Sequence, residues 1–205
     1  MINVRLRAFT FAILLLSVFS VHAQQATAEA PPVMPSGTYK MDKNHAYLVF
    51  SYLHMGFSHP MLRFTNFDVE IQYDSANIDN SKATVNIAVS SIDSGVATFN
   101  AELAGEKFLD GGKFPEITFV STSYKTTGKD TAVLAGDLTI KGVSKPVSLD
   151  VRLNRAAEHP MSKNPMLGFS ATGKFNRSEF GMGMFTPMVS DELGLQFEGE
   201  FGLAK

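Results

Sequence analysis

The chain contains neither cysteine nor tryptophan, and the missing cysteine already excludes several classes of protein. None of its 205 residues carries a thiol, so it has no disulfide framework, no thiolate-bound metal and no cysteine to acylate. A domain without such crosslinks must be stabilised by its hydrophobic core. The length is sufficient for one domain with such a core.

The sequence also lacks any concentration of charge of one sign. Eighteen Lys and Arg residues against twenty Asp and Glu residues give a formal net charge of −2. Binding to nucleic acid requires a concentrated basic face that displaces counterions. The sequence therefore predicts no nucleic-acid partner.

Common catalytic motifs are missing as well. The sequence has no G-x-S-x-G elbow, no phosphate-binding P-loop and no HExxH motif. Its acidic residues are scattered among turns and outward strand positions, and no serine has a recognisable base nearby. We therefore expect a protein that is not an enzyme and needs no cofactor.

Long hydrophobic runs are absent except at the N-terminus. Arg5 and Arg7 precede an apolar run of 14 residues, Ala8 to Val21, and Val21-His22-Ala23 follows the small-x-small rule of signal peptidase sites. The run is short for a membrane span, although an uncleaved anchor is the alternative. We expect residues 1–23 to be a signal peptide, cleaved before Gln24, and the protein to be periplasmic. Cleavage would remove two arginines and no acid, so the net charge would change from −2 to −4.

After the expected cleavage site the sequence changes character twice. Residues 24–36, QQATAEAPPVMPS, have no periodicity and predict a flexible tether. Residues 37–205 contain short segments in which apolar and polar residues alternate, which is typical of strands with one buried face. We expect about eight antiparallel strands, and one helical segment over Asn100–Asp110 with Asn100 as its N-cap.

Eight such strands fit a sandwich or a closed barrel, and the inward positions favour the barrel. Large side chains share these positions with Gly136, Gly173 and Gly199, and glycine leaves room inside a strand. A barrel of this size either holds one small ligand or is filled by its own side chains. Seventeen Phe and ten Met residues favour a cavity for a flexible apolar guest. A filled core is the alternative.

Five stretches in order carry a resemblance to a known family: DKNHAYLVFSYLHMGFS, LAGEKFLDGGKFPEITFVST, LAGDLTIKGVSKPVSLDV, GFSATGKFNRSEFGM and VSDELGLQFEGEF. Together they resemble the YceI-like polyisoprenoid-binding family from Gly37 to Lys205. The resemblance implies an all-β fold, an eight-stranded antiparallel lipocalin-like β-barrel with one short helical segment. It also implies an isoprenoid lipid, of polyprenyl pyrophosphate or quinone type, in the lumen. Leu62 and Gly111-Gly112 depart from the family pattern and leave the shape of the loops open.

We expect the ligand to be bound by side chains on the inward tracks and at the rim. These predicted ligand-binding residues are Leu48, Phe50, Tyr52, His54, Ile87, Val89, Phe119, Leu138, Ile140, Leu149, Val151, Phe169, Phe175, Phe197 and Arg177.

The polar residues among them have more than one interpretation. His54, at the end of an inward track, could contact a head group or be structural. Arg177 could bind a phosphate through its planar fork of donors, or pair with Glu179 or another nearby acid. His45, His54 and His59 could form a metal or enzymatic site, because imidazole and methionine sulfur suit copper. However, His54 and His59 have neither helical nor strand spacing, so we expect no metal.

Two kinds of surface contact complete the expectations. A carrier of lipid would touch the membrane transiently. A barrel with a filled core would instead be an interaction module, and a homodimer could form through the outward residues Tyr47, Val49 and Leu53.

Overall fold

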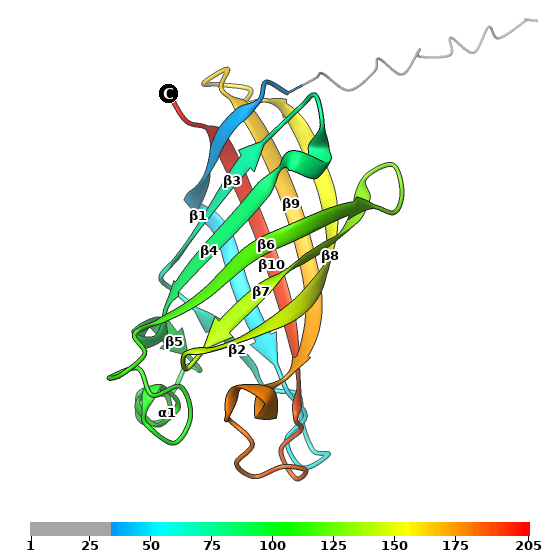
Figure 1. Ribbon diagram of the computed structural model, residues 1–205. Coiled ribbons are helices and arrows are strands. Elements are labelled where there is room, and N and C mark those ends of the chain that lie inside the picture. Colours follow the sequence, from blue (N-terminus) through cyan, green and yellow to red (C-terminus); the bar gives the residue numbers. More distant parts are fainter. Residues whose placement is uncertain (1–33) are drawn as a thin grey trace, which may run out of the picture. The chain divides into compact units, whose positions relative to one another are not determined.

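The computed structural model describes residues 34–205 (Figure 1). The predicted signal peptide and most of the predicted tether lie outside the described residues. Within residues 34–205, no helix has both the length and the apolar character needed to cross a membrane.

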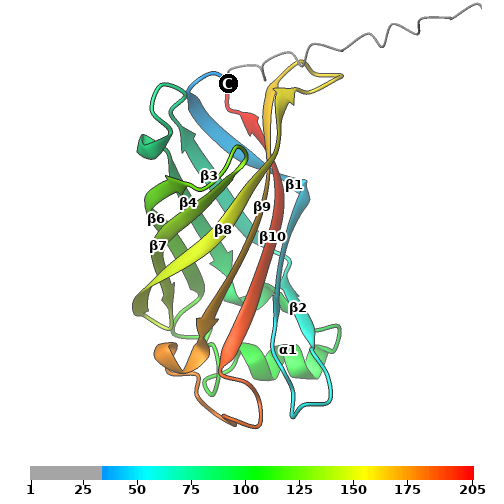
Figure 2. The same ribbon diagram turned by 90° about the vertical axis from the view of Figure 1, so that its right-hand side faces the viewer.

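Eight strands form a closed antiparallel barrel, as predicted (Figures 1 and 2). The ring closes because β1 pairs with β10, at the other end of the described chain, as well as with β3. The barrel strands are β1 (Gly37–Ser51), β3 (Phe67–Tyr73), β4 (Lys82–Ala88), β6 (Glu116–Thr126), β7 (Thr131–Ile140), β8 (Val143–Glu158), β9 (Pro165–Asn176) and β10 (Glu192–Leu203).

Two short strands extend the wall at one end of the barrel. The first part of β1 pairs with β3, whereas its last part, Leu48 to Ser51, pairs with β2 (Met61–Phe64). Strand β5 (Ile92–Asp93) then pairs with β2. Strand β1 is therefore long enough to pair with both β3 and β2 along the same edge.

Local turn chemistry sets the register of the hairpins. Lys141 and Gly142 join β7 to β8 with φ of 52° and 74°, and Ile140 faces Val143 across the turn. Two central residues with positive φ define a type I′ turn, whose twist matches that of paired strands. Residues 140–143 therefore form a tight β-hairpin.

The helix lies earlier than predicted. Helix α1 spans Ala97–Ala104, and its N-cap is Val96 rather than Asn100. The Asn100 side chain instead accepts hydrogen bonds from the backbone N–H and the hydroxyl of Ser94, at 2.7 and 2.6 Å. Residues 105–113 are turns, so the predicted C-terminal part of the helix is wrong. Asn100 lies inside α1, and its side chain binds Ser94 in the segment that leads into the helix.

Three 3-10 turns interrupt the barrel: η1 (Ile78–Asn80), η2 (Val89–Ser91) and η3 (Arg177–Phe180). Val89 was predicted to lie on an inward track together with Ile87. It belongs to η2 instead, because β4 ends at Ala88. Its N–H donates to the carbonyl of Pro115 at 2.9 Å, which ties this turn to the start of β6.

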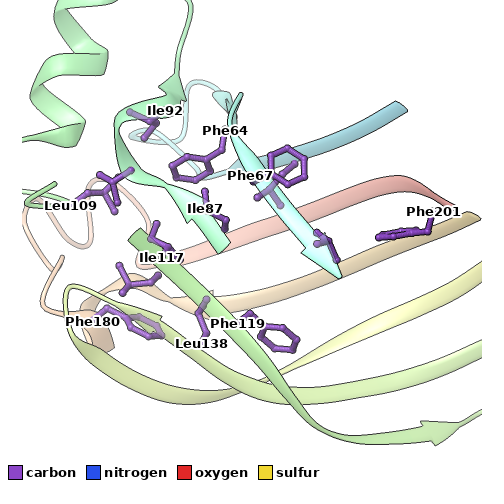
Figure 3. Close-up of a cluster of buried hydrophobic side chains, with 14 of the residues drawn as sticks. Phe64, Phe67, Ile87, Ile92, Leu109, Ile117, Phe119, Leu138, Phe180 and Phe201 are labelled. Carbon is purple, nitrogen blue, oxygen red and sulfur yellow. The ribbon is translucent and has the colours of Figure 1, made fainter. Parts of the chain in front are cut away.

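Inward side chains form the core. Near α1, Ile92 and Leu109 close the end of the cluster, while Phe201 lies towards the other end of the barrel (Figure 3). Tyr39, Phe180 and Phe201 are among the most completely buried side chains.

The three inward glycines act differently from the prediction that they leave empty space. A Cβ on Gly136 would lie 2.3 Å from the Phe119 ring, one on Gly173 2.5 Å from Leu149, and one on Gly199 2.4 Å from the Phe197 ring. Each glycine thus makes room for a large neighbour to lie against the wall.

Candidate functional site: an apolar lumen in two chambers

The barrel encloses two adjoining cavities. The mouth chamber, about 260 Å³, lies at the end that carries α1 and η3. The inner chamber, about 420 Å³, lies between the barrel walls. Five side chains line both chambers and form the waist between them: Leu48, Ile87, Leu138, Phe175 and Leu195.

The residues predicted to bind a ligand lie along this lumen, with one exception. Those in the mouth chamber are Leu48, Phe50, Tyr52, His54, Ile87, Leu138, Ile140, Phe175 and Arg177. Those in the inner chamber, apart from the waist, are Phe119, Leu149, Val151, Phe169 and Phe197. Val89 lines neither chamber, because the η2 turn directs its packing towards the loop before β6. The alternation of each strand was sufficient to identify the wall.

The predicted ligand-binding residues did not include the side chains that close the mouth. Phe99 and Leu103 come from α1, Phe108 from the turn after it, and Phe185 from the loop between η3 and β10. The rings of Phe108 and Phe185 lie 6.4 Å apart between centroids, so these two segments meet over the mouth chamber. The only sign of this closure in the sequence was the apolar run GMGMF at 181–185, which does not fit the alternation of any strand.

Arg177 is buried at the mouth chamber, and no carboxylate within residues 34–205 forms an ion pair with it. Its Nε donates to the carbonyl of Ser190 at 2.9 Å, one Nη to that of Val189 at 3.0 Å, and the other Nη to that of Met182. The sequence left open a phosphate or a pairing with Glu179, and the structure shows a guanidinium bonded to backbone carbonyls rather than to Glu179. Burial lowers the pKa of the guanidinium, opposed by the nearby charge of Asp191, and arginine remains protonated. The cation holds the 182–190 loop in place.

The other polar side chains that line the mouth chamber are Tyr52 and His54, just after β1, and Glu102 of α1. Burial raises the pKa of the Tyr52 phenol, and the charge of Arg177 opposes that rise. The backbone of His54 is fixed by a tight turn, since its N–H donates to the Ser58 carbonyl and its carbonyl accepts from Phe57 N–H, both at 2.9 Å. The imidazole is thus held at the rim.

The three histidines considered for a metal do not converge. His45 lies on the outer surface, where a hydrogen bond of 2.9 Å joins its Nδ1 to Asp42, and His59 is exposed. Among residues 34–205, no three His, Cys, Asp or Glu side chains are grouped closely enough to hold a metal ion.

A second, more polar edge lies where β3, η1 and β4 meet. Tyr73, Ser75, Ser81 and Lys82 line the inner chamber there, together with Tyr124 of β6. Burial raises the pKa of the Tyr124 phenol, and Tyr73 and Asp79 raise it further. The lumen is therefore apolar along its walls and carries hydroxyls at this edge.

An antiparallel eight-stranded barrel with an apolar lumen defines the class of small barrels that can enclose one apolar molecule. Residues 39–201 match the YceI-like domain. The chain belongs to the YceI-like family.

Individual relatives agree with this membership. A UPF0312 protein of Pseudomonas putida is 37% identical over 175 residues, covering 84% of this chain and 86% of that protein. The Campylobacter jejuni YceI protein has a similar structure, with a TM-score of 0.68, 28% identity, and coverage of 74% of this chain and 90% of that chain.

A domain of Saccharophagus degradans described as polyisoprenoid-binding shares the fold, with a TM-score of 0.61 and 12% identity, covering 83% of this chain and 100% of that chain.

Proposed function

We propose that this protein is an exported carrier or reservoir that holds the long apolar tail of an isoprenoid lipid in the barrel lumen. The observation that carries the proposal is the pair of adjoining chambers, whose lining is almost entirely apolar from the mouth to the Tyr73 edge. The family membership and the described ligand of the Saccharophagus degradans domain support it. Export rests on the predicted signal peptide.

The volume of the lumen limits the tail that fits inside. A cavity of ~150 Å³ holds one benzene ring, which corresponds to roughly 25 Å³ per carbon. On that scale the mouth chamber accommodates about ten carbons and the inner chamber about seventeen. A longer tail would have to extend through the mouth or widen the waist.

The energetics favour exchange over tight retention. Burying hydrocarbon from water is worth roughly 0.8 kcal/mol per CH₂, so a tail of about 25 carbons would gain on the order of 20 kcal/mol. In a bilayer, however, the same tail is already out of water. Transfer from membrane to barrel is therefore near neutral before the cost of ordering the chain, which suits a carrier.

Both ends of the lumen offer hydrogen-bond donors to a head group. At the mouth, Arg177 already donates to three carbonyls, although a guanidinium has five N–H donors. At the inner edge, the phenols of Tyr73 and Tyr124 offer donors. We propose that the apolar tail lies along the shared waist whichever end holds the head group.

The test is native mass spectrometry and organic extraction of protein purified without detergent, for the natural chain and for Phe169→Asp. A carboxylate at position 169 would face the inner chamber, and we expect it to abolish the isoprenoid adduct. Thr172→Asp is the matched control, because Thr172 lies on the outer face of the same strand. A natural protein that never carries an isoprenoid would refute the proposal, as would an undiminished adduct in folded Phe169→Asp.

A further inference from the structure

Two loops form a rigid apolar projection beside the mouth of the lumen. We call apolar tip the exposed side chains of the 54–58 turn and of the 184–188 loop: Met55, Phe57, Met184, Phe185 and Met188. Phe57 is the most exposed of these, at 86%. Exposed apolar side chains that gather in one place mark interaction sites, whereas scattered ones do not.

The two loops are held together by their backbones. Met55 N–H donates to the carbonyl of Met188 at 2.8 Å, and Ser190 N–H donates to that of Leu53 at 2.9 Å. Leu53 N–H donates in turn to the Ser190 hydroxyl at 2.9 Å. Both loops lie together at the lower end of the barrel in Figure 1. Hydrogen bonds between the two loops therefore hold the tip together as one surface.

Its composition departs from that of the remaining surface. Residues 53–63 and 181–190 contain no Asp or Glu, although the chain has twenty such residues. The charged or titratable groups in these segments are His54, His59 and Arg63. Nothing in these two loops repels the phosphate groups of a membrane surface, and the apolar side chains suit burial at the boundary between head groups and acyl chains.

The tip is also continuous with the lumen. Met184 and Phe185 belong to the tip and line the mouth chamber at the same time. The ring of Phe185 contacts Phe108 from the opposite side of the mouth. An apolar tail leaving a bilayer beside the tip would pass from acyl chains to these side chains without crossing water.

We propose that the apolar tip is a membrane-docking surface, which inserts into the outer layer of a lipid bilayer and places the mouth of the lumen against it. The bilayer is favoured over a second copy of the chain because the tip is made of protruding loops rather than a flat face. Such loops fit a deformable apolar phase. This inference rests on the proposed function.

The experiment is flotation of the full exported chain with vesicles of phosphatidylcholine and phosphatidylglycerol in equal parts. We expect the natural protein to float with the vesicles. Met188→Asp and Phe57→Asp should each weaken binding roughly tenfold or more, because a side chain worth ~1.5 kcal/mol or more of burial is replaced by a charge. The matched control is Met161→Asp, in the β8–β9 hairpin at the other end of the barrel (Figure 2), which should bind as the natural protein does.

Three outcomes would overturn the docking surface: no flotation of the natural protein, equal flotation of Met188→Asp, or equal loss in Met161→Asp. Sedimentation without vesicles provides a fourth outcome. If the natural protein is a dimer that Met188→Asp dissociates, the tip binds a second copy of the chain instead of a membrane. Uptake of isoprenoid from detergent micelles separates the two proposals. A natural protein that takes up isoprenoid but does not float refutes docking alone, whereas one that floats but never takes up isoprenoid refutes the carrier function alone.

Discussion

Arg177 organises the mouth of the lumen at the scale of a single residue. Its three hydrogen bonds go to carbonyls of residues 182, 189 and 190. It thereby fixes the conformation of a loop that lies outside the helices and strands. Hydrogen bonds from charged donors contribute more than neutral ones, and a buried carbonyl left without a donor is costly.

Replacing Arg177 with methionine should lower the free energy of unfolding by about 3 kcal/mol, measured by urea denaturation. Lysine should not restore it, because a single ammonium cannot reach three diverging carbonyls. Arg152→Met, on the exposed face of β8, serves as the control and should change stability by less than about 0.5 kcal/mol. A loss below about 1 kcal/mol in Arg177→Met would contradict the assigned role.

His45 and Asp42 give a second prediction at this scale. The hydrogen bond and charge of Asp42 raise the pKa of the His45 imidazole, and the same hydrogen bond lowers the pKa of the Asp42 carboxyl. The pair therefore stabilises the fold only at pH values between the pKa of folded Asp42 and the pKa of folded His45. Its contribution is lost as pH rises through the pKa of folded His45, and also as pH falls through that of folded Asp42.

A titration followed by NMR should find the pKa of His45 above that of an ordinary histidine. Asp42→Asn should bring it down towards the ordinary value. Asp68→Asn, which removes a carboxylate that does not contact His45, should leave it unchanged. If the His45 titration curve is the same in Asp42→Asn, the hydrogen bond does not exist in solution.

At the scale of the strand, glycines decide how side chains fill the barrel. On β7, the inward position 136 is covered by the Phe119 ring from the neighbouring strand. The ring lies against the wall instead of crossing the lumen. A strand of uniformly large residues would fill the axis and leave no chamber.

Gly136→Ala should therefore disturb both packing and lumen. Its Cβ would meet the Phe119 ring at 2.3 Å and the carbonyl of Val120 at 2.6 Å, so the ring must move inward. We expect a loss of about 1 to 3 kcal/mol from overpacking and a smaller inner chamber, measured by urea unfolding and by the length of the bound tail. Gly112→Ala, where no atom lies within 4 Å of the new Cβ, is the control. Equal behaviour of the two variants would refute this packing.

At the scale of the whole molecule, the end of the barrel opposite α1 is closed by residues that precede the first strand. Met34 is 4% exposed and lines the inner chamber. The Pro35 carbonyl accepts a hydrogen bond from the Tyr39 hydroxyl at 2.9 Å, and the hydroxyls of Ser36 and Ser75 are 2.8 Å apart. The last three residues of the predicted tether thus pack on the barrel.

Met34→Ala should lower the free energy of unfolding by about 2 to 4 kcal/mol, because it removes a buried side chain that cannot be replaced from elsewhere. Thermal or urea unfolding measures it. Met161→Ala, at a position 84% exposed, should have almost no effect. A negligible loss in Met34→Ala would mean that residues 34–36 do not belong to the folded domain.

Most of the wall could be predicted because alternation is a local property. Phe169 and Ala171 face inward for the same reason that Ser170 and Thr172 face outward, since successive side chains of a strand point to opposite faces. Where the strand stops, this rule fails. Val89 was misplaced because the chain turns into η2 after Ala88, and the sequence VSS does not distinguish a strand from such a turn.

The closure of the mouth could not be predicted, because the contacts that close it join distant segments. The partners of Arg177 are backbone carbonyls, which every residue has, so no sequence signal selects those of residues 182, 189 and 190. The start of α1 was likewise misjudged, since Asn100 resembles a cap and instead bonds Ser94. The meeting of Phe108 with Phe185 depends on how both loops cross the end of the barrel.

The sequence by itself determined the all-β class, the number of barrel strands and which side chains face inward, because period-two alternation and turn residues act over a few positions. Only the tertiary structure decided the size of the lumen, its division at the waist, the partners of Arg177 and the apolar tip. Those features depend on closing β1 against β10, and closure brings together residues that no local pattern relates.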